Sequence, residues 1–390
     1  MKKLFKGGHI FDGTGKLPYL SDILIENGLI VEIGEDIVCD DALKVDCSGK
    51  FLMPGLIDCH IHMCMKGSAN ADLWMSNMSR AEHVLHMVDN LYSHLKSGTT
   101  YIRDMGATNY DDIGLKKALK AGMFTGANFV CSGSVICITG GHGHTFGREA
   151  DGVDECRKAT REQIKAGADV IKFMATGGVL TGGVQPGSPQ LTADEMNAIV
   201  SEAKRADRMT ATHAQGSQGI MDAVKAGVDS IEHGIFLNDE IIDEMLERGT
   251  WLVPTLVAPL AIIEAGVEAG IPAFAVEKSK MVYKPHLASF KKAYDAGVKI
   301  AMGTDAGTPF NFHGTSGREI QLMIDAGMTP MDALRSATDK AAQLLRVDHE
   351  RGTLIKGKVA DILVLGENPL LSPEVLLNKK DVYQNGDLVK

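Results

Sequence analysis

Two histidines in the segment Met53-Pro54-Gly55-Leu56-Ile57-Asp58-Cys59-His60-Ile61-His62 are spaced so that they could share a ligand. The segment includes a Pro-Gly turn and is then apolar on both faces, as is typical of a parallel strand buried between two layers. Side chains alternate between the faces of a strand, so His60 and His62 point to the same side, about 6–7 Å apart. Two imidazoles at that spacing can converge on one small metal ion. The alternative is that each is a core histidine bonded to a neighbour.

Further residues with metal-binding chemistry stand at the ends of other apolar runs that predict strands. They are Lys172, His213, His233 and Asp305. If the strands are parallel, their carboxyl ends meet at one edge and bring these side chains together. Imidazole and carboxylate ligands suit a borderline divalent ion; zinc is the expected one, and manganese, cobalt or iron would also fit. Four histidines and an aspartate exceed one tetrahedral site with an open position, so the pattern predicts two ions.

Lys172 is the unusual member of this group. An ammonium would be repelled by two divalent cations, and a neutral amine offers one lone pair to one ion. If the amine adds carbon dioxide it becomes a carbamate, an anion with two oxygens that can bridge two metals. The alternative is a lysine at a strand end that extends to solvent.

The elements that would position these residues repeat along the chain. A helical run ends in glycine and a β-rich run follows, which predicts parallel strands joined by helical crossovers. The junctions lie at Gly98, Gly122, Gly167, Gly227, Gly249 and Gly297. The predicted strands cover 53–62, 99–104, 127–133, 168–174, 209–213, 228–233, 250–256 and 298–305. Eight such units favour an α/β fold of the (β/α)₈ TIM-barrel type, and a doubly wound open sheet is disfavoured because no G-x-G-x-x-G opens the first unit.

Both ends of the chain have β character instead. Asn27-Gly28 separates two β runs and predicts a type I′ hairpin, and Asn385-Gly386 repeats the signal near the C-terminus. A final helix is expected from Pro330 to about Arg346. We therefore predict a small β-sandwich domain from residues 1–50 and 352–390, with a metal-dependent hydrolase barrel at 51–351 between them.

Composition restricts the partners and the compartment. The net charge is −10 and there is no basic block, which argues against nucleic acid or an anionic membrane as a partner. No apolar run is long enough to span a membrane, and Met1 to Gly15 has no apolar core of a signal peptide. The seven cysteines all lie within the first 156 residues and include no CxxC, which favours reduced thiols and a cytoplasmic protein.

These motifs together resemble the amidohydrolase superfamily, in particular its binuclear members with a carboxylated lysine. The resemblance covers nearly the whole chain and includes "MPGLIDCHIH", "SIEHG", "GTDAGTP" and "GTLIKGKVADILVL". It implies that His60, His62 and Asp305 bind one metal. It also implies that His213 and His233 bind the other, and that the Lys172 carbamate and a hydroxide bridge both. Asp305 would then be the general base as the hydroxide attacks an amide.

The loop after the third predicted strand suggests a branch of this superfamily. Thr139-Gly-Gly-His142-Gly-His144, followed by Phe173-Met-Ala-Thr-Gly-Gly178, is similar to the branch of prolidases (Xaa-Pro dipeptidases) and arginine/lysine carboxypeptidases, and to a fungal ochratoxin-hydrolysing amidohydrolase. The resemblance implies that His142 polarises the substrate carbonyl. Arg148 is a candidate to hold a substrate carboxylate, because a guanidinium pairs with it bidentately; the alternative for both residues is a polar loop position. The Gly-rich run from Thr181 to Pro189 is either a lid or a plain connection.

The expected substrate is a small molecule, a dipeptide or an N-acyl amino acid with a free C-terminal carboxylate. Two alternatives stay open. The same metal site could hydrolyse cyclic amides or lactones, as in imidazolonepropionase-like enzymes, or the barrel could bind metal without catalysis. We expect a homo-oligomer.

Overall fold

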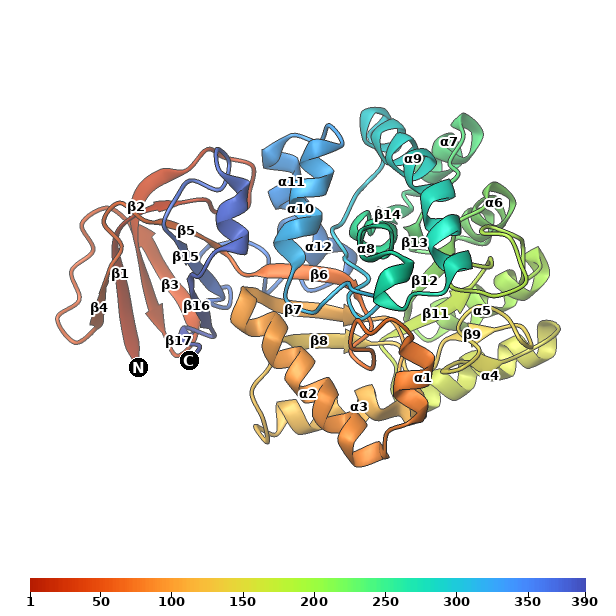
Figure 1. Cartoon of the computed structure of the whole chain (residues 1–390). Coiled ribbons are helices and arrows are strands. Elements are labelled where there is room, and N and C mark those ends of the chain that lie inside the picture. Colours follow the sequence, from red (N-terminus) through yellow and green to blue (C-terminus); the bar gives the residue numbers. More distant parts are fainter.

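One β-sheet contains strands from both ends of the chain. The computed structural model describes the backbone of residues 1–390 and every side chain except those at positions 72 and 76. The sheet has eight strands in the order β17-β16-β15-β5-β1-β2-β3, with β4 paired to β1. They are β1 Lys2–Ile10, β2 Tyr19–Glu26, β3 Leu29–Gly34, β4 Leu43–Asp46, β5 Phe51–Pro54, β15 Ile362–Leu365, β16 Asp381–Gln384 and β17 Asp387–Leu388. Antiparallel pairing of β5 with β15 joins the two ends of the chain in this sheet, at the left of Figure 1.

Two hairpin turns in this sheet are as predicted. Asn27 and Gly28 have φ values of 51° and 82° between the antiparallel strands β2 and β3. Asn385 and Gly386, with φ values of 51° and 76°, join β16 to β17. Positive φ at both central positions is what a type I′ turn requires, and the Asn-Gly pair provides it at low cost.

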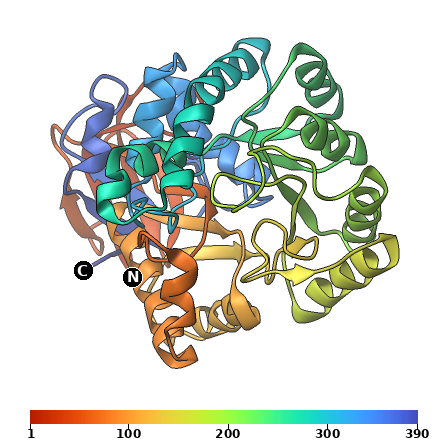
Figure 2. The ribbon, with the colours of Figure 1, turned by 45° about the vertical axis from the view of Figure 1, so that its right-hand side comes forward.

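The rest of the chain alternates parallel strands with helices. The strands form a six-stranded sheet, β10-β9-β11-β12-β13-β14, and a three-stranded sheet, β6-β7-β8. Their bounds are β6 Leu56–Ile61, β7 Thr99–Asp104, β8 Asn128–Cys131, β9 Ile136–Cys137, β10 Arg148–Glu149, β11 Val170–Met174, β12 Met209–Ala214, β13 Ser230–His233 and β14 Trp251–Val253. Figure 2 shows the helices as an outer layer around these strands.

The helices are α1 Ala71–Ser76, α2 Arg80–Ser97, α3 Asp111–Lys120, α4 Val153–Ala166, α5 Ala193–Arg205, α6 Ser217–Ala226, α7 Asp239–Arg248, α8 Val257–Ala265, α9 Ala273–Ala296, α10 Ser316–Asp325, α11 Pro330–Ser336 and α12 Asp339–Leu344. Short 3₁₀ turns occupy Thr108–Tyr110, Val267–Ala269 and Pro373–Leu377. The largest apolar core lies between the strands and this helical layer, where Leu91 of α2 and Ile199 of α5 are fully buried. Within the described residues, no helix has both the length and the apolar character needed to cross a membrane.

Glycine ends five of the described helices in the way that the repeated junction predicts. Gly98, Gly167, Gly227, Gly249 and Gly297 all take the left-handed conformation directly after a helix. That conformation is costly for a residue with a Cβ, so glycine stops the helix and turns the chain toward the next strand.

The predicted eighth strand and the last predicted helix differ from what is observed. Residues 298–305 form no regular strand in the described structure. Ile300 makes an isolated parallel bridge to Leu252, and Ala306, directly after this segment, makes one to Ile61. The parallel strands therefore lie in two sheets and not in one closed sheet. Asp305, at the end of the segment, has a left-handed backbone with φ of 59°, through which a regular strand does not continue.

The last helix is divided into α11 and α12. Two carbonyls at the break accept hydrogen bonds, one from β6 and one from the segment 298–305, instead of continuing the helix. The N–H of Ile57 donates to the carbonyl of Ala337 at 2.8 Å, and the N–H of Met302 donates to that of Ser336 at 2.8 Å.

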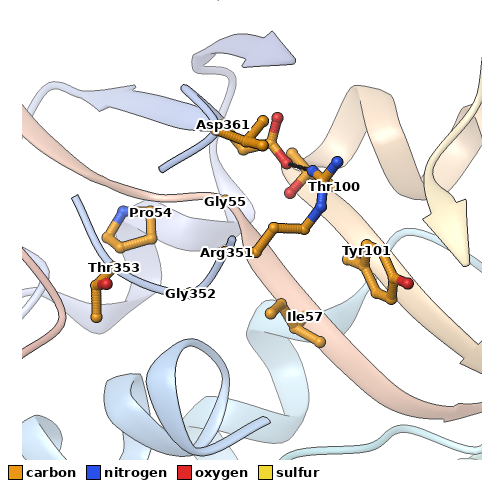
Figure 3. Close-up of a pocket in the computed structure, with 10 residues that line it drawn as sticks. Pro54, Gly55, Ile57, Thr100, Tyr101, Arg351, Gly352, Thr353 and Asp361 are labelled. Carbon is orange, nitrogen blue, oxygen red and sulfur yellow. Dashed lines mark hydrogen bonds and ion pairs between the residues drawn. The ribbon is translucent and has the colours of Figure 1, made fainter. Parts of the chain in front are cut away.

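A junction at Gly55 connects the terminal sheet to the parallel strands, and Figure 3 shows its side chains. Arg351 pairs with Asp361, and its guanidinium lies 5.3 Å from the centre of the Tyr101 ring. The N–H of Gly55 donates to the carbonyl of Asp361 at 2.9 Å. A Cβ added at Gly55 would lie 2.3 Å from Oγ1 of Thr100, so this close approach requires glycine.

Candidate metal centre and active site

A cavity of about 380 Å³ opens at the carboxyl ends of the parallel strands. Every predicted metal ligand lines it, together with both loop histidines: His60, His62, Lys172, His213, His233, Asp305, His142 and His144. The alternation of side chains on β6 directs His60 and His62 to the same side, as expected. The remaining ligands come from β11, β12, β13 and the segment 298–305, so strand ends that are distant in sequence form one site.

Three of the ligands form a compact group. Oδ1 of Asp305 lies 3.3 Å from Nε2 of His60 and 3.4 Å from Nε2 of His62. One potential ligand atom from each of the three residues can be chosen so that all lie within 4.8 Å of one another. Two imidazole nitrogens and one carboxylate oxygen at these separations match the donor types that hold zinc and related divalent ions.

His213 and His233 lie beside this group. Their rings are 4.6 Å apart, and the ring of His233 is 5.2 Å from that of His60. Nδ1 of His233 is 2.7 Å from the hydroxyl of Thr255, which occupies one nitrogen and leaves Nε2 for a ligand. Nε2 of His213 is buried without a hydrogen-bond partner among the described residues. A buried nitrogen of this kind is costly unless something binds it, and a metal ion would.

Burial also prepares the imidazoles as ligands. It lowers the pKa of His60, His213 and His233 well below the ordinary value, and it lowers that of His62 to about 3. The rings are therefore neutral at physiological pH and keep a lone pair, which metal binding requires. The donor set fits a divalent cation.

Lys172 is buried on β11, with 1% of its surface exposed. Its Nζ makes no ion pair with a carboxylate among the described residues. Burial lowers the pKa of Lys172 to about 8 and raises the pKa of Asp305 to about 8, in each case because the charged form loses its hydration. Lys172 therefore loses its proton more readily than a surface lysine does. Its side chain does not extend to solvent, which was the alternative for a lysine at a strand end.

Three residues at the site have left-handed backbone conformations that non-glycine residues avoid. The φ values are 71° for His233, 54° for Thr255 and 59° for Asp305. Each costs on the order of 1–3 kcal/mol and persists only where the surrounding structure imposes it. Two of the three are predicted ligands and the third bonds a ligand. The strained backbone therefore occurs at residues whose side chains form the site.

The residues that orient His60 were not predicted from the sequence. Nδ1 of His60 lies 2.7 Å from Oε2 of Glu232, so the ring donates there and directs Nε2 away from the carboxylate. Oε1 of Glu232 accepts hydrogen bonds from Arg103 at 2.9 Å and from Ser230 at 2.6 Å. Glu232 and Arg103 are both fully buried. Partners of this type fix the tautomer and orientation of a ligating histidine. The available signal was a carboxylate directly before His233 in a strand with no exposed face.

The two predicted substrate residues have different surroundings. His142 lines the cavity, and its ring centre is 4.0 Å from that of His213. Arg148 is not among the described residues that line the cavity. Its guanidinium bonds Glu162 and Glu155, each at 2.9 Å, and these carboxylates raise its pKa. Both partners are on α4, on the outer layer, so the structure gives Arg148 a surface ion-pair network and not the expected place at the site.

Comparisons with known proteins identify the family of this chain. A sequence model described as the amidohydrolase family matches residues 51–389. Ochratoxinase from Aspergillus niger is 32% identical over 373 residues, covering 87% of this chain and 75% of that protein. The crystal structure of a Xaa-Pro dipeptidase with bound methionine in the active site superposes with a TM-score of 0.93 at 34% identity, over 100% of both chains. A prolidase complexed with N-methylphosphonate-L-proline has the same TM-score at 30% identity, also over 100% of both chains. The chain therefore belongs to the amidohydrolase family.

Proposed function

We propose that this protein is a metal-dependent hydrolase of the amide bond in dipeptides or N-acyl amino acids that carry a free C-terminal carboxylate. The observation that carries this proposal is the convergence of the six predicted ligands and His142 on one cavity. The whole-chain similarity to proteins described as a Xaa-Pro dipeptidase and a prolidase supports an amide substrate.

We propose that His60, His62 and Asp305 hold one divalent ion, expected to be zinc, and that His213 and His233 hold a second. The neutral amine of Lys172 would add carbon dioxide and lose a proton, and the resulting carbamate would be an anionic ligand that could help to hold both ions. Such a pair of ions, when bound, supplies an acidified water and a polarised carbonyl at neutral pH.

The chain's own residues would then perform two tasks. The carboxylate of Asp305 accepts the proton of the attacking water and returns it to the leaving amine. His142 donates an N–H to the substrate carbonyl, where negative charge develops. Because water is the nucleophile, no covalent acyl-enzyme forms.

We propose that residues 51–351 form a (β/α)₈ barrel and that residues 1–50 and 352–390 form a separate β domain. The hydrogen bonds of residues 298–305 to both neighbours support a barrel arrangement: the N–H of Cys59 donates to the carbonyl of Met302 at 2.9 Å, and the N–H of Ala301 donates to that of Leu252 at 3.0 Å.

The requirement for a substrate carboxylate is tested with matched substrates. We expect an Xaa-Pro or N-acyl amino acid substrate to lose tenfold or more in kcat/KM when its C-terminus is amidated, which is about 1.4 kcal/mol of transition-state binding. The physical reason is that a held carboxylate orients the amide, and orientation lowers the barrier. Initial rates with each acid and its amide, on the zinc-loaded enzyme, measure this effect.

A panel of lactones and cyclic amides is the control for that experiment. Equal rates for acids and amides, or lactones that are hydrolysed far faster than every peptide, would refute the substrate assignment. Neither result would contradict the proposed metal site.

A further inference from the structure

We propose that Thr181 is a positioning residue that holds His142 with its Nε2–H available to the substrate carbonyl, and that Lys278 on α9 keeps Thr181 in place. The inference rests on the proposed function, because it gives His142 the role of carbonyl donor. It assigns a role to the glycine-rich connection between β11 and α5, here called the 176–190 loop.

The 176–190 loop is closed at its base by backbone hydrogen bonds. Thr176 and Pro189 form an antiparallel bridge, and the N–H of Gly177 donates to the carbonyl of Ser188 at 2.9 Å. The N–H of Gly187 donates back to the carbonyl of Gly177 at 2.9 Å. The tip of the loop lies at the cavity. Its lining includes Val179, Leu180, Thr181 and Gly182.

This loop bonds His142 at two points. Nδ1 of His142 is 2.7 Å from the hydroxyl of Thr181, and the backbone N–H of His142 donates to Oε1 of Gln190 at 3.0 Å. The Thr181 hydroxyl oxygen also accepts the N–H of Gly178 at 3.2 Å. The hydroxyl has one hydrogen to donate, and Nδ1 of His142 is the acceptor that the described residues place within its reach, so we infer that Thr181 donates to Nδ1.

The tautomer of His142 follows from that donation. A neutral imidazole carries one N–H, so an Nδ1 that accepts from Thr181 places the hydrogen on Nε2. A histidine that polarises a carbonyl must present a donor, and Nε2–H is then that donor. Without the Thr181 hydroxyl, nothing described at Nδ1 favours this tautomer over the other.

Gly178 allows the loop to reach the two rings. A Cβ built on Gly178 would lie 2.7 Å from Cε1 of His142 and 2.9 Å from Cε1 of His213. Real side chains do not tolerate such contacts, so only glycine lets the backbone pass this close to the site. The loop is therefore packed against the residues that it would position.

Lys278 of α9 bonds the backbone at the tip of the loop. Its Nζ donates to the carbonyls of Thr181 and Val184, each at 2.6 Å. The ammonium also lies 5.2 Å from the centre of the Phe274 ring, which lines the cavity. Lys278 thus links α9 to the tip of the 176–190 loop at Thr181, the residue that bonds His142.

Kinetics of zinc-loaded, full-length variants test the proposal. Thr181→Val is expected to lower kcat about tenfold or more, with KM changed less than about twofold and metal content unchanged, because only a transition-state donor is misplaced. Thr181→Ser keeps the hydroxyl and should retain most of the activity. Lys278→Met should lower kcat by about threefold or more, whereas the matched variant Lys280→Met, at an exposed position of the same helix, should have no effect.

The tautomer is measured separately by nitrogen-15 NMR of histidine-labelled zinc enzyme, with the His142 signals assigned by their loss in His142→Gln. We expect a protonated Nε2 and an unprotonated Nδ1 in the wild type, and loss of this preference in Thr181→Val. A protonated Nδ1 in the wild type would overturn the proposal, as would a Thr181→Val enzyme with wild-type spectrum and wild-type kcat. If the wild type hydrolyses none of the peptide substrates, the proposed function fails, and the spectrum still decides whether Thr181 sets the tautomer.

Discussion

Lys172→Ala is expected to lose both metal and activity. The variant removes the group proposed to contact both ions, so metal content should fall to about one ion per chain or less and kcat/KM should fall about a thousandfold or more. Elemental analysis and initial rates on the same preparation measure the two losses together. Lys299→Ala is the matched control, because its Nζ lies 5.6 Å from the centre of the Trp251 ring and contacts none of the proposed ligands.

Chemical rescue distinguishes a carbamate at Lys172 from an unmodified lysine. Short-chain carboxylic acids should restore part of the metal content and activity of Lys172→Ala, because their carboxylate supplies the missing oxygens. Lys172→Arg should stay inactive, because a guanidinium keeps its charge and cannot become an anionic ligand. An active arginine variant would refute the role of Lys172.

Asp305→Asn is expected to abolish turnover. An amide cannot accept the proton of the attacking water, and loss of a positioned general base costs about 10²–10⁴-fold in rate. Burial alone raises the pKa of Asp305 to about 8, and bound divalent cations would lower it by favouring the charged carboxylate. The same requirement predicts that kcat/KM of the wild type falls toward low pH, where the carboxylate is protonated. The measurement is kcat of the variant at known metal content, since Asp305 is also a proposed ligand.

Ordinary rates for Asp305→Asn at full metal occupancy would contradict this mechanism. So would a covalent acyl-enzyme trapped from the wild type and detected by mass spectrometry, because water is the proposed nucleophile. These two results are independent, and either one is sufficient.

Much of the site could be predicted because its residues follow from local rules. The alternation of a strand places His60 and His62 on one side, and parallel strands place His213 and His233 at the same edge. The helix-glycine-strand junctions locate those strands without any tertiary information, since a glycine after a helix has a strong local preference. These features are visible in the sequence because each depends on neighbouring residues.

The features that the sequence did not reveal depend on contacts between distant segments. The pairing of Arg103 with Glu232 joins β7 to β13, and no local pattern specifies it. Arg148 was expected at the site because it follows the histidine loop, but Glu155 and Glu162 of α4 bind its guanidinium. The close packing of residues 298–305 against β6 is also a contact between distant segments: a Cβ at Gly303 would lie 2.8 Å from that of His60.

The metal content of wild-type protein purified without chelator tests the binuclear site most directly. Elemental analysis per chain should give about two divalent ions, because the six converging residues exceed what one ion requires. Zinc is the expected element. A reproducible content near one ion per chain, with full activity retained after replacement of His213 or His233, would contradict the account.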